Sequence, residues 1–85
     1  SAKRAAVVKI ACETDFVARN QDFKTLADDL AMQVAALAPA DLPALLAQPF
    51  LKDEQLTVGE VIQSAIQKFG ERIEVVNFSR LALES

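Results

Sequence analysis

The chain has 85 residues, of which 52% are hydrophobic and 25% are charged, a balance typical of one small globular domain and too apolar for a disordered chain. Its net charge of −3 argues against a general nucleic-acid binder, which needs a basic surplus. No apolar run approaches the roughly 20 residues of a membrane span, and we expect no signal peptide. The single cysteine excludes an internal disulfide, and this absence of a disulfide indicates a reducing compartment.

The first predicted element is a strand over residues 5–12, "AAVVKIAC". Its residues are apolar or β-branched apart from Lys9, a pattern that favours a strand covered over most of its length. Cys12 is interpreted as a small buried hydrophobe rather than a reactive thiol.

A turn over residues 12–20, "CETDFVARN", follows the strand and contains one large apolar side chain, Phe16. The residues alone leave two interpretations open. In the first, Phe16 packs beneath its own helix and Asp15 only caps that helix. In the second, Phe16 points outward and is available to a partner.

A helix is predicted from the N-cap Asn20 to the prolines that begin at Pro39. Apolar residues recur every three or four positions, as on an amphipathic helix. They are Phe23, Leu26, Ala27, Leu30, Ala31, Val34 and Leu37. Met32 is assigned to the core together with Phe23. The polar residues assigned to the solvent face are Lys24, Asp28, Asp29 and Gln33.

The middle of the chain carries weaker signals. Asp41 is predicted to cap a short helix that runs through Ala47, and Pro49 ends it. The following "LKDEQ" is predicted to be a turn. Phe50 is equally compatible with the core and with the surface.

The next helix begins at residues 57–60, "TVGE", which have the form of a capping box. Gly70 supplies the left-handed residue that ends it. Its apolar stripe comprises Val58, Val61, Ile62, Ala65, Ile66 and Phe69.

The last segment, "RIEVVNFSRLAL", is predicted to be a strand with Val76 and Phe78 on one face. The other face carries Ile73, Val75, Leu81 and Leu83. Asn77 and Ser79 interrupt that second face. Either both faces are partly covered, or a bulge shifts the register near Asn77.

The predicted order of elements is therefore strand, helix, short helix, helix, strand. The fold class that buries these faces is α+β: a two-layer domain with a small antiparallel sheet and helices packed on one face. Two strands alone make a marginal sheet, so we expect a third strand from residues before Ser1 or from another molecule.

Several absences argue against catalysis. The sequence has no histidine, which removes Ser-His and Cys-His nucleophiles and most zinc sites. Its two glycines do not form a phosphate-binding loop. Glu13 and Asp15 would share one face of a strand, but this is a weak indication of acid–base chemistry. We expect that the chain is not an enzyme and needs no cofactor and no metal.

Two stretches carry a resemblance to a known family. "CETDFVARNQDFKTLADDLAMQVAAL" resembles the core domain of elongation factor Ts, the nucleotide-exchange factor of translation elongation factor Tu. "QPFLKDEQLTVGEVIQSAIQKFGERIEVVNFSRLAL" is similar to the family's capped helix, "GE" turn and final strand. Residues 1–85 are therefore expected to form a single core-like domain. We expect this domain to lack the family's N-terminal three-helix domain and part of its central helical region, where residues 38–47 stand. Val76 and Asn77 replace its usual basic pair.

The resemblance implies a site as well as a function. In the family, the corresponding turn contacts elongation factor Tu, and its Phe wedges between helices of the GTPase's nucleotide domain. Carried over, Phe16 is the wedge, Asp15 is a polar contact beside it, and Thr14 and Val17 shape the turn. These four residues form the predicted partner-binding site.

The function implied is guanine-nucleotide exchange, in which the chain binds elongation factor Tu and promotes GDP release during translation elongation. The alternative is a dimerisation or scaffold domain that forms a homodimer through its sheet and has no exchange activity. Neither function involves direct contact with nucleic acid or a membrane. The expected compartment is the bacterial cytoplasm or the matrix or stroma of an organelle.

Overall fold

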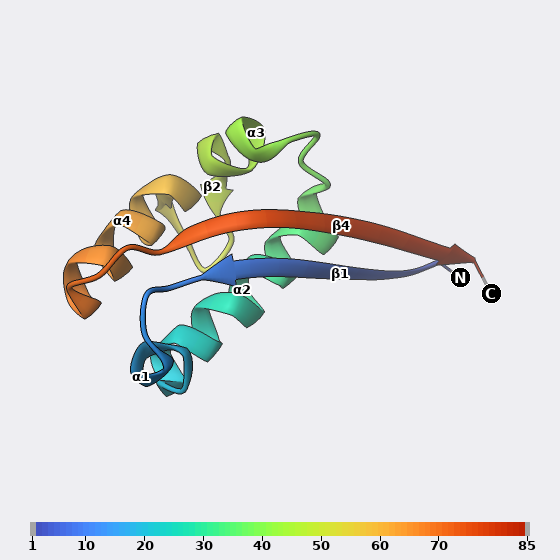
Figure 1. The fold of residues 1–85 in the computed structure, drawn as a ribbon. Coiled ribbons are helices and arrows are strands. Elements are labelled where there is room, and N and C mark those ends of the chain that lie inside the picture. The colour runs from blue at the N-terminus through green and yellow to red at the C-terminus, as the bar shows by residue number, and fades with distance from the viewer. Residues whose placement is uncertain (1, 85) are drawn as a thin grey trace.

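The computed structural model describes residues 2–84, with side chains over residues 5–81. In chain order, the elements are β1 (Ala2–Ala11), α1 (Asp15–Ala18), α2 (Gln21–Leu37), α3 (Leu42–Ala47), β2 (Pro49–Phe50), β3 (Asp53–Thr57), α4 (Val58–Phe69) and β4 (Glu74–Glu84). Strands β1 and β4 lie side by side as a long ribbon, and α2 crosses one of its faces (Figure 1).

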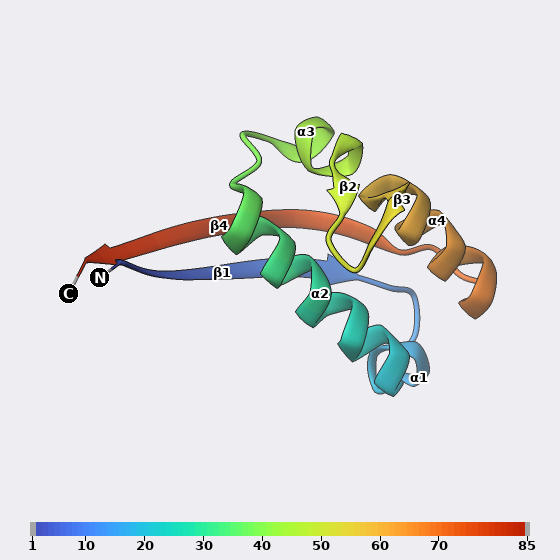
Figure 2. The same ribbon diagram turned by 180° about the vertical axis from the view of Figure 1, so that it is seen from behind.

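The two long strands pair antiparallel, from Ala2 opposite Glu84 to Ala11 opposite Glu74. Seen from behind, α2 and α4 lie on the near side of the ribbon (Figure 2), and no described element covers the opposite side, which faces the viewer in Figure 1. The predicted fold class is confirmed: an α+β domain in two layers. The buried hydrophobic side chains between the layers are Val17, Phe23, Leu26, Leu30, Val34, Leu45, Phe50, Val58, Ile62, Ile73 and Val75.

One residue bulges out of β4. Lys9 pairs with Asn77, whereas Ile10 pairs with Val75, so Val76 has no partner on β1. Of the two explanations that the sequence left open for this strand, the bulge is confirmed.

The bulge exchanges the two faces of β4 beyond it. Val75 is buried and Phe78 packs against the same core, while Leu81 is 56% exposed. The prediction that grouped Leu81 with Val75 and Phe78 with Val76 is wrong, because counting by twos across an inserted residue reverses the assignment. The side chain of Leu83 lies outside the described residues.

Helix α2 begins as predicted, since the Asn20 side chain accepts a hydrogen bond from the backbone N–H of Asp22 at 2.8 Å. Lys24 and Asp28 are exposed, as expected. Met32 is 57% exposed, so its assignment to the core is wrong.

Among residues 2–84, no helix is long and apolar enough to cross a membrane.

Gln33 was assigned to the solvent face of α2, and this prediction is also wrong: its exposed fraction is 0%. Its amide nitrogen donates to the Gln48 side-chain oxygen at 3.1 Å and to the Pro49 carbonyl at 3.0 Å. Its amide oxygen accepts from the Leu51 N–H at 3.0 Å. A buried amide is stable here because these partners replace water.

The segment held by Gln33 is a short antiparallel hairpin of β2 and β3. The predicted turn is therefore wrong in extent, because Asp53 and the next four residues form a strand. Phe50, which the sequence left open, is buried in the core. Asp29 does not simply face solvent, since Lys52 in the hairpin pairs with it at 2.9 Å. This hairpin is a separate sheet and does not supply β1 and β4 with a third strand.

The remaining helices begin and end as their local signals predict. Asp41 caps α3, with its carboxylate accepting from the Ala44 N–H at 2.9 Å. The capping box of α4 is complete: Thr57 accepts from the Glu60 N–H at 3.1 Å, and the Glu60 carboxylate accepts from the Thr57 N–H at 2.9 Å. Gly70 ends α4 at a φ of 69°, in the left-handed region.

Two substitutions test the helix assignments. Thr57→Ala removes one helix cap and should lower the free energy of unfolding by about 1 kcal/mol. Leu30→Ala empties a fully buried position and should cost about 2–5 kcal/mol. Urea denaturation of both variants measures the difference, and the reverse ranking would mean that the buried face of α2 is misassigned.

Ala38 offers a stabilising substitution. It follows α2 at a φ of 46°, where a Cβ is strained and glycine is not. Ala38→Gly should raise the free energy of unfolding by about 0.5–1 kcal/mol, after allowing for the extra entropy of glycine in the unfolded chain. The exposed helical residue Ala36 is the control, since Ala36→Gly should lower stability by a similar amount; a loss at both positions would contradict the strain argument.

Candidate functional site

The turn after β1 contains a one-turn helix, α1, which the sequence analysis did not separate from the turn. Thr14 is its N-cap, and the Thr14 hydroxyl accepts a hydrogen bond from the Val17 N–H at 3.3 Å. The Arg19 N–H donates to the Asp15 carbonyl at 3.0 Å and closes the turn. The interpretation of Asp15 as the cap is wrong, because Thr14 has that role and Asp15 is the first helical residue.

Phe16 and Val17 point in different directions from this helix. Val17 is 5% exposed and belongs to the core, whereas Phe16 is 85% exposed. Successive helical residues are about 100° apart, so burying Val17 turns Phe16 away from the domain. The interpretation in which Phe16 packs beneath its own helix is therefore excluded. We call residues 14–17 the Phe16 turn.

The surface around Phe16 is polar. Phe16 lines an open depression together with Arg19 and Asn20, and Asp15 and Arg19 are both exposed. Because the core does not use the Phe16 ring, a partner could bury it. The four predicted site residues thus divide into two groups: Asp15 and Phe16 face solvent, whereas Val17 is buried and Thr14 orders the backbone.

A carboxylate from the far end of the chain reaches this turn. Glu71 Oε1 accepts hydrogen bonds from the backbone N–H groups of Glu13 and Thr14, each at 3.0 Å. Glu71 Oε2 accepts from the Thr14 hydroxyl at 3.0 Å. Sequence reasoning missed Glu71, which lies 57 positions from Thr14. The only available signal was its place after the helix-ending Gly70.

The Glu13 carboxylate completes the connection in the other direction by accepting from the Arg72 N–H. Glu13 and Asp15 do not share a strand face, because β1 ends at Ala11. Their predicted pairing is therefore wrong, and the weak suggestion of acid–base chemistry loses its geometric basis. Within residues 5–81, no three His, Cys, Asp or Glu side chains are grouped so that they could hold a metal ion.

Cys12 lies beside this connection. Its thiol donates to the Thr14 carbonyl at 3.3 Å, and the side chain is half-buried against the core. The interpretation of Cys12 as a hydrophobic packing residue is confirmed in part, since burial is incomplete.

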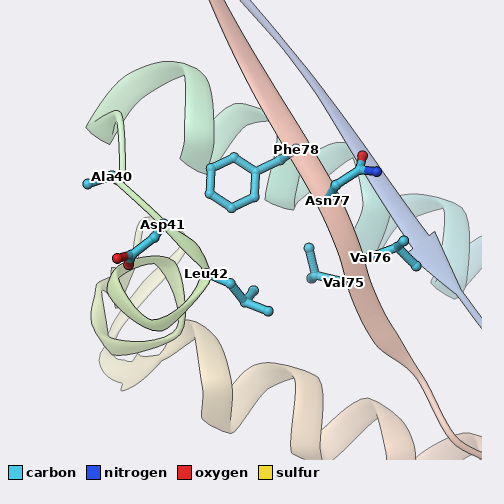
Figure 3. A pocket seen from close by; sticks show the side chains of 7 residues that line it. All are labelled: Ala40, Asp41, Leu42, Val75, Val76, Asn77 and Phe78. Carbon is cyan, nitrogen blue, oxygen red and sulfur yellow. The ribbon is translucent and has the colours of Figure 1, made fainter.

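A separate groove lies between the start of α3 and β4, with a volume of about 240 Å³. Val75 and Phe78 point into it from β4, and Leu42 faces them from α3, whereas Val76 and Asn77 point to the other side of the strand (Figure 3). Its walls are mainly apolar, and the carboxylate at its rim already caps α3. The groove lacks the convergent polar groups typical of a small-molecule site.

The uncovered face of the sheet is also apolar in part. Val7, Val76 and Leu81 are 69%, 46% and 56% exposed, respectively. Ala5 and Ser79 lie beside them and help to line a shallow hollow. This face and the Phe16 turn are distinct surfaces, because Phe16 belongs to α1, which lies beyond the end of β1 (Figure 1).

Comparisons with known proteins agree with the resemblance noted in the sequence. The family described as Elongation factor TS matches residues 13–85. A protein of Nostoc sp. named Elongation factor Ts is 44% identical over 81 residues, which cover 95% of this chain and 25% of that protein. Proteins with the same name from Thioalkalivibrio sulfidiphilus and Clostridium tetani are 42% and 32% identical over 94% and 98% of this chain.

The chain spans about a quarter of the length of these relatives: 25% of the Nostoc protein, 26% of the Thioalkalivibrio protein and 27% of the Clostridium protein. The family match extends from the Phe16 turn to the last strand, and therefore includes both sides of the connection between Thr14 and Glu71. With this coverage, the chain belongs to the elongation factor Ts family of translation elongation factors.

Proposed function

We propose that this domain is the part of an elongation factor Ts protein that binds elongation factor Tu through the Phe16 turn and promotes GDP release. The observation that carries the proposal is the 85% exposure of Phe16 on a hydrogen-bonded turn. Membership of the family supports the choice of partner. Binding, rather than chemical catalysis by residues of this chain, is the proposed mode of action.

The energetics favour Phe16 as the main contact. Burying a Phe side chain gains roughly 1.5–3 kcal/mol, and interface energy concentrates in a few such residues. Phe16 contributes little to the core of its own domain, so this free energy is available to a partner. The neighbouring Val17 is fixed in the core and the turn is capped, so little conformational entropy remains to be lost on binding.

Exchange follows only if binding depends on the nucleotide. A factor that binds the GDP-bound and nucleotide-free GTPase equally well shifts no equilibrium. We propose that Phe16 inserts between helices of the GTPase's nucleotide domain in a conformation that holds GDP poorly. Asp15, exposed next to it, supplies a polar contact at the rim. By linkage, this domain must weaken GDP binding by the same factor by which GDP weakens binding of the domain.

A second candidate function is self-association through the sheet. The exposed Val7, Val76 and Leu81 favour it, as does a β1–β4 sheet of two strands, because a two-stranded sheet is marginal alone. Sedimentation at two protein concentrations tests it. Leu81→Lys, on the uncovered face, should shift any dimer towards monomer, whereas a monomer's sedimentation coefficient at both concentrations would contradict self-association.

Substitutions of Phe16, in α1, and Phe23, in α2, distinguish an effect on binding from an effect on folding. Phe16→Ala should weaken binding to elongation factor Tu by about 10- to 100-fold and leave the melting temperature nearly unchanged. Phe23→Ala, at a buried position, should instead lower the melting temperature, because it opens a cavity. Titration calorimetry and thermal denaturation measure the two effects. If Phe16→Ala unfolds the domain as a core substitution does, the binding proposal fails.

Exchange itself is tested with a fluorescent GDP bound to elongation factor Tu. High concentrations of this domain should speed release of the labelled GDP, and excess unlabelled GDP should in turn weaken binding of the domain. Phe16→Ala should lose most of the acceleration. If the domain binds at saturation without changing the release rate, it is a binding module and not an exchange factor.

A further inference from the structure

We propose that Glu71 is the positioning residue for Phe16. Its carboxylate holds the Phe16 turn in the orientation that presents the ring to a partner, although Glu71 itself need not touch that partner. This inference rests on the proposed function for its consequence in binding. Its structural part can be tested without any partner.

The Glu71 carboxylate accepts hydrogen bonds from backbone N–H groups that have no other acceptor among the described residues. Beyond Ala11, where β1 ends, the N–H groups of Glu13 and Thr14 both point at Glu71 Oε1, at 3.0 Å each. An ionised oxygen accepts two such bonds more strongly than a neutral one. Glu71 therefore holds the backbone where the chain leaves the sheet and enters α1.

The second carboxylate oxygen sets the direction of the Thr14 hydroxyl. A hydroxyl has one proton to donate and two lone pairs that accept. Because the Thr14 hydroxyl donates to the Glu71 carboxylate, with Oε2 at 3.0 Å and Oε1 at 3.3 Å, a lone pair is left to accept the Val17 N–H at 3.3 Å. Glu71 thereby fixes the cap of α1, and the cap fixes the helix that carries Phe16.

The backbone on both sides of Glu71 is also fixed. It follows Gly70, whose φ of 69° turns the chain sharply at the end of α4. The next residue, Arg72, donates its N–H to the Glu13 carboxylate. The segment at Glu13 and Thr14 and the segment at Glu71 and Arg72 therefore each accept a hydrogen bond from the other. The Phe16 turn is thus attached to α4 and β4, in addition to its covalent attachment to β1 and α2.

Phe16 depends on this attachment because its own side chain makes little contact with the domain. With Phe16 85% exposed, the backbone of α1 and the buried Val17 determine where its ring points. The hydrogen bonds to Glu71 are exposed, so water can replace them after truncation, and the folded state should lose little stability. The loss should appear as disorder of the Phe16 turn.

Three variants of the full chain test the role. Glu71→Ala removes both carboxylate oxygens that accept hydrogen bonds from Glu13 and Thr14. Glu71→Gln keeps one oxygen for the two N–H groups and should rescue in part. Glu74→Ala is the matched control, because it removes the same charge from a nearby exposed residue whose carboxylate pairs with the Arg72 side chain at 3.8 Å, outside the Phe16 turn.

The partner-free measurement is amide hydrogen exchange by NMR. In Glu71→Ala, the amides of Glu13, Thr14 and Val17 should exchange at least about tenfold faster, while the amide of the core residue Leu30 keeps its protection. Glu74→Ala should exchange like the wild type. Unchanged exchange at Glu13 and Thr14 in Glu71→Ala would overturn the proposal, as would an equal loss of protection at Leu30.

The binding measurement is a double-mutant cycle with Phe16→Ala on elongation factor Tu. Glu71→Ala should raise the Kd about five- to tenfold in the wild-type background and less than about twofold in the Phe16→Ala background. Glu71→Gln should be intermediate, and Glu74→Ala should bind like the wild type. An equal effect in both backgrounds would mean that Glu71 acts independently of Phe16 and would overturn the positioning role. If the wild type does not bind at all, the proposed function fails, and amide exchange alone decides whether Glu71 orders the turn.

Discussion

The pairing of β1 with β4 is the constraint on which the other features depend. These strands come from the two ends of the chain, and their antiparallel register places Ala11 opposite Glu74. The segments that leave the sheet at this end are therefore neighbours in space, although nearly the whole chain separates them. Only because of this pairing can the Glu71 carboxylate reach Thr14, 57 positions away, and the Glu13 carboxylate reach the backbone of Arg72.

The register of this pairing determines which side chains of β4 face the helices. If β4 ran without its bulge at Val76, either Val75 or Phe78 would point away from the helices, because side chains alternate along a regular strand. The inserted residue lets both contribute to the core, and it leaves Leu81 on the uncovered face. The apolar character of that face is thus partly a consequence of filling the layer beneath α2.

The sequence predicts this fold well where a feature depends on residues within one helical turn. The caps at Asn20 and Asp41, the capping box that begins at Thr57 and the left-handed Gly70 are all recognisable locally, because each donor and acceptor lie within four positions. Prediction from the sequence fails where a segment far away in the chain determines the environment of a residue. Gln33 is buried because the β2–β3 hairpin supplies its hydrogen-bond partners, and Glu71 reaches the Phe16 turn because β4 pairs with β1. The direction of Phe16 stayed open for the same reason, since it depends on whether Val17 or Phe16 fits the core.

That choice between two adjacent side chains also separates the core from the proposed binding surface. The smaller Val17 fills the position in the core, and the larger Phe16 is left exposed, so a substitution at one need not disturb the other. Thr14 connects Val17 with Glu71, because its hydroxyl accepts a hydrogen bond from the Val17 N–H and donates one to the Glu71 carboxylate. A side chain at this point influences both the packing of Val17 and the direction of Phe16. If Phe16 is the contact with the GTPase, then evolution can adjust exchange through the turn and its carboxylate without repacking the core, and the residues that tune the activity need not themselves lie in the interface.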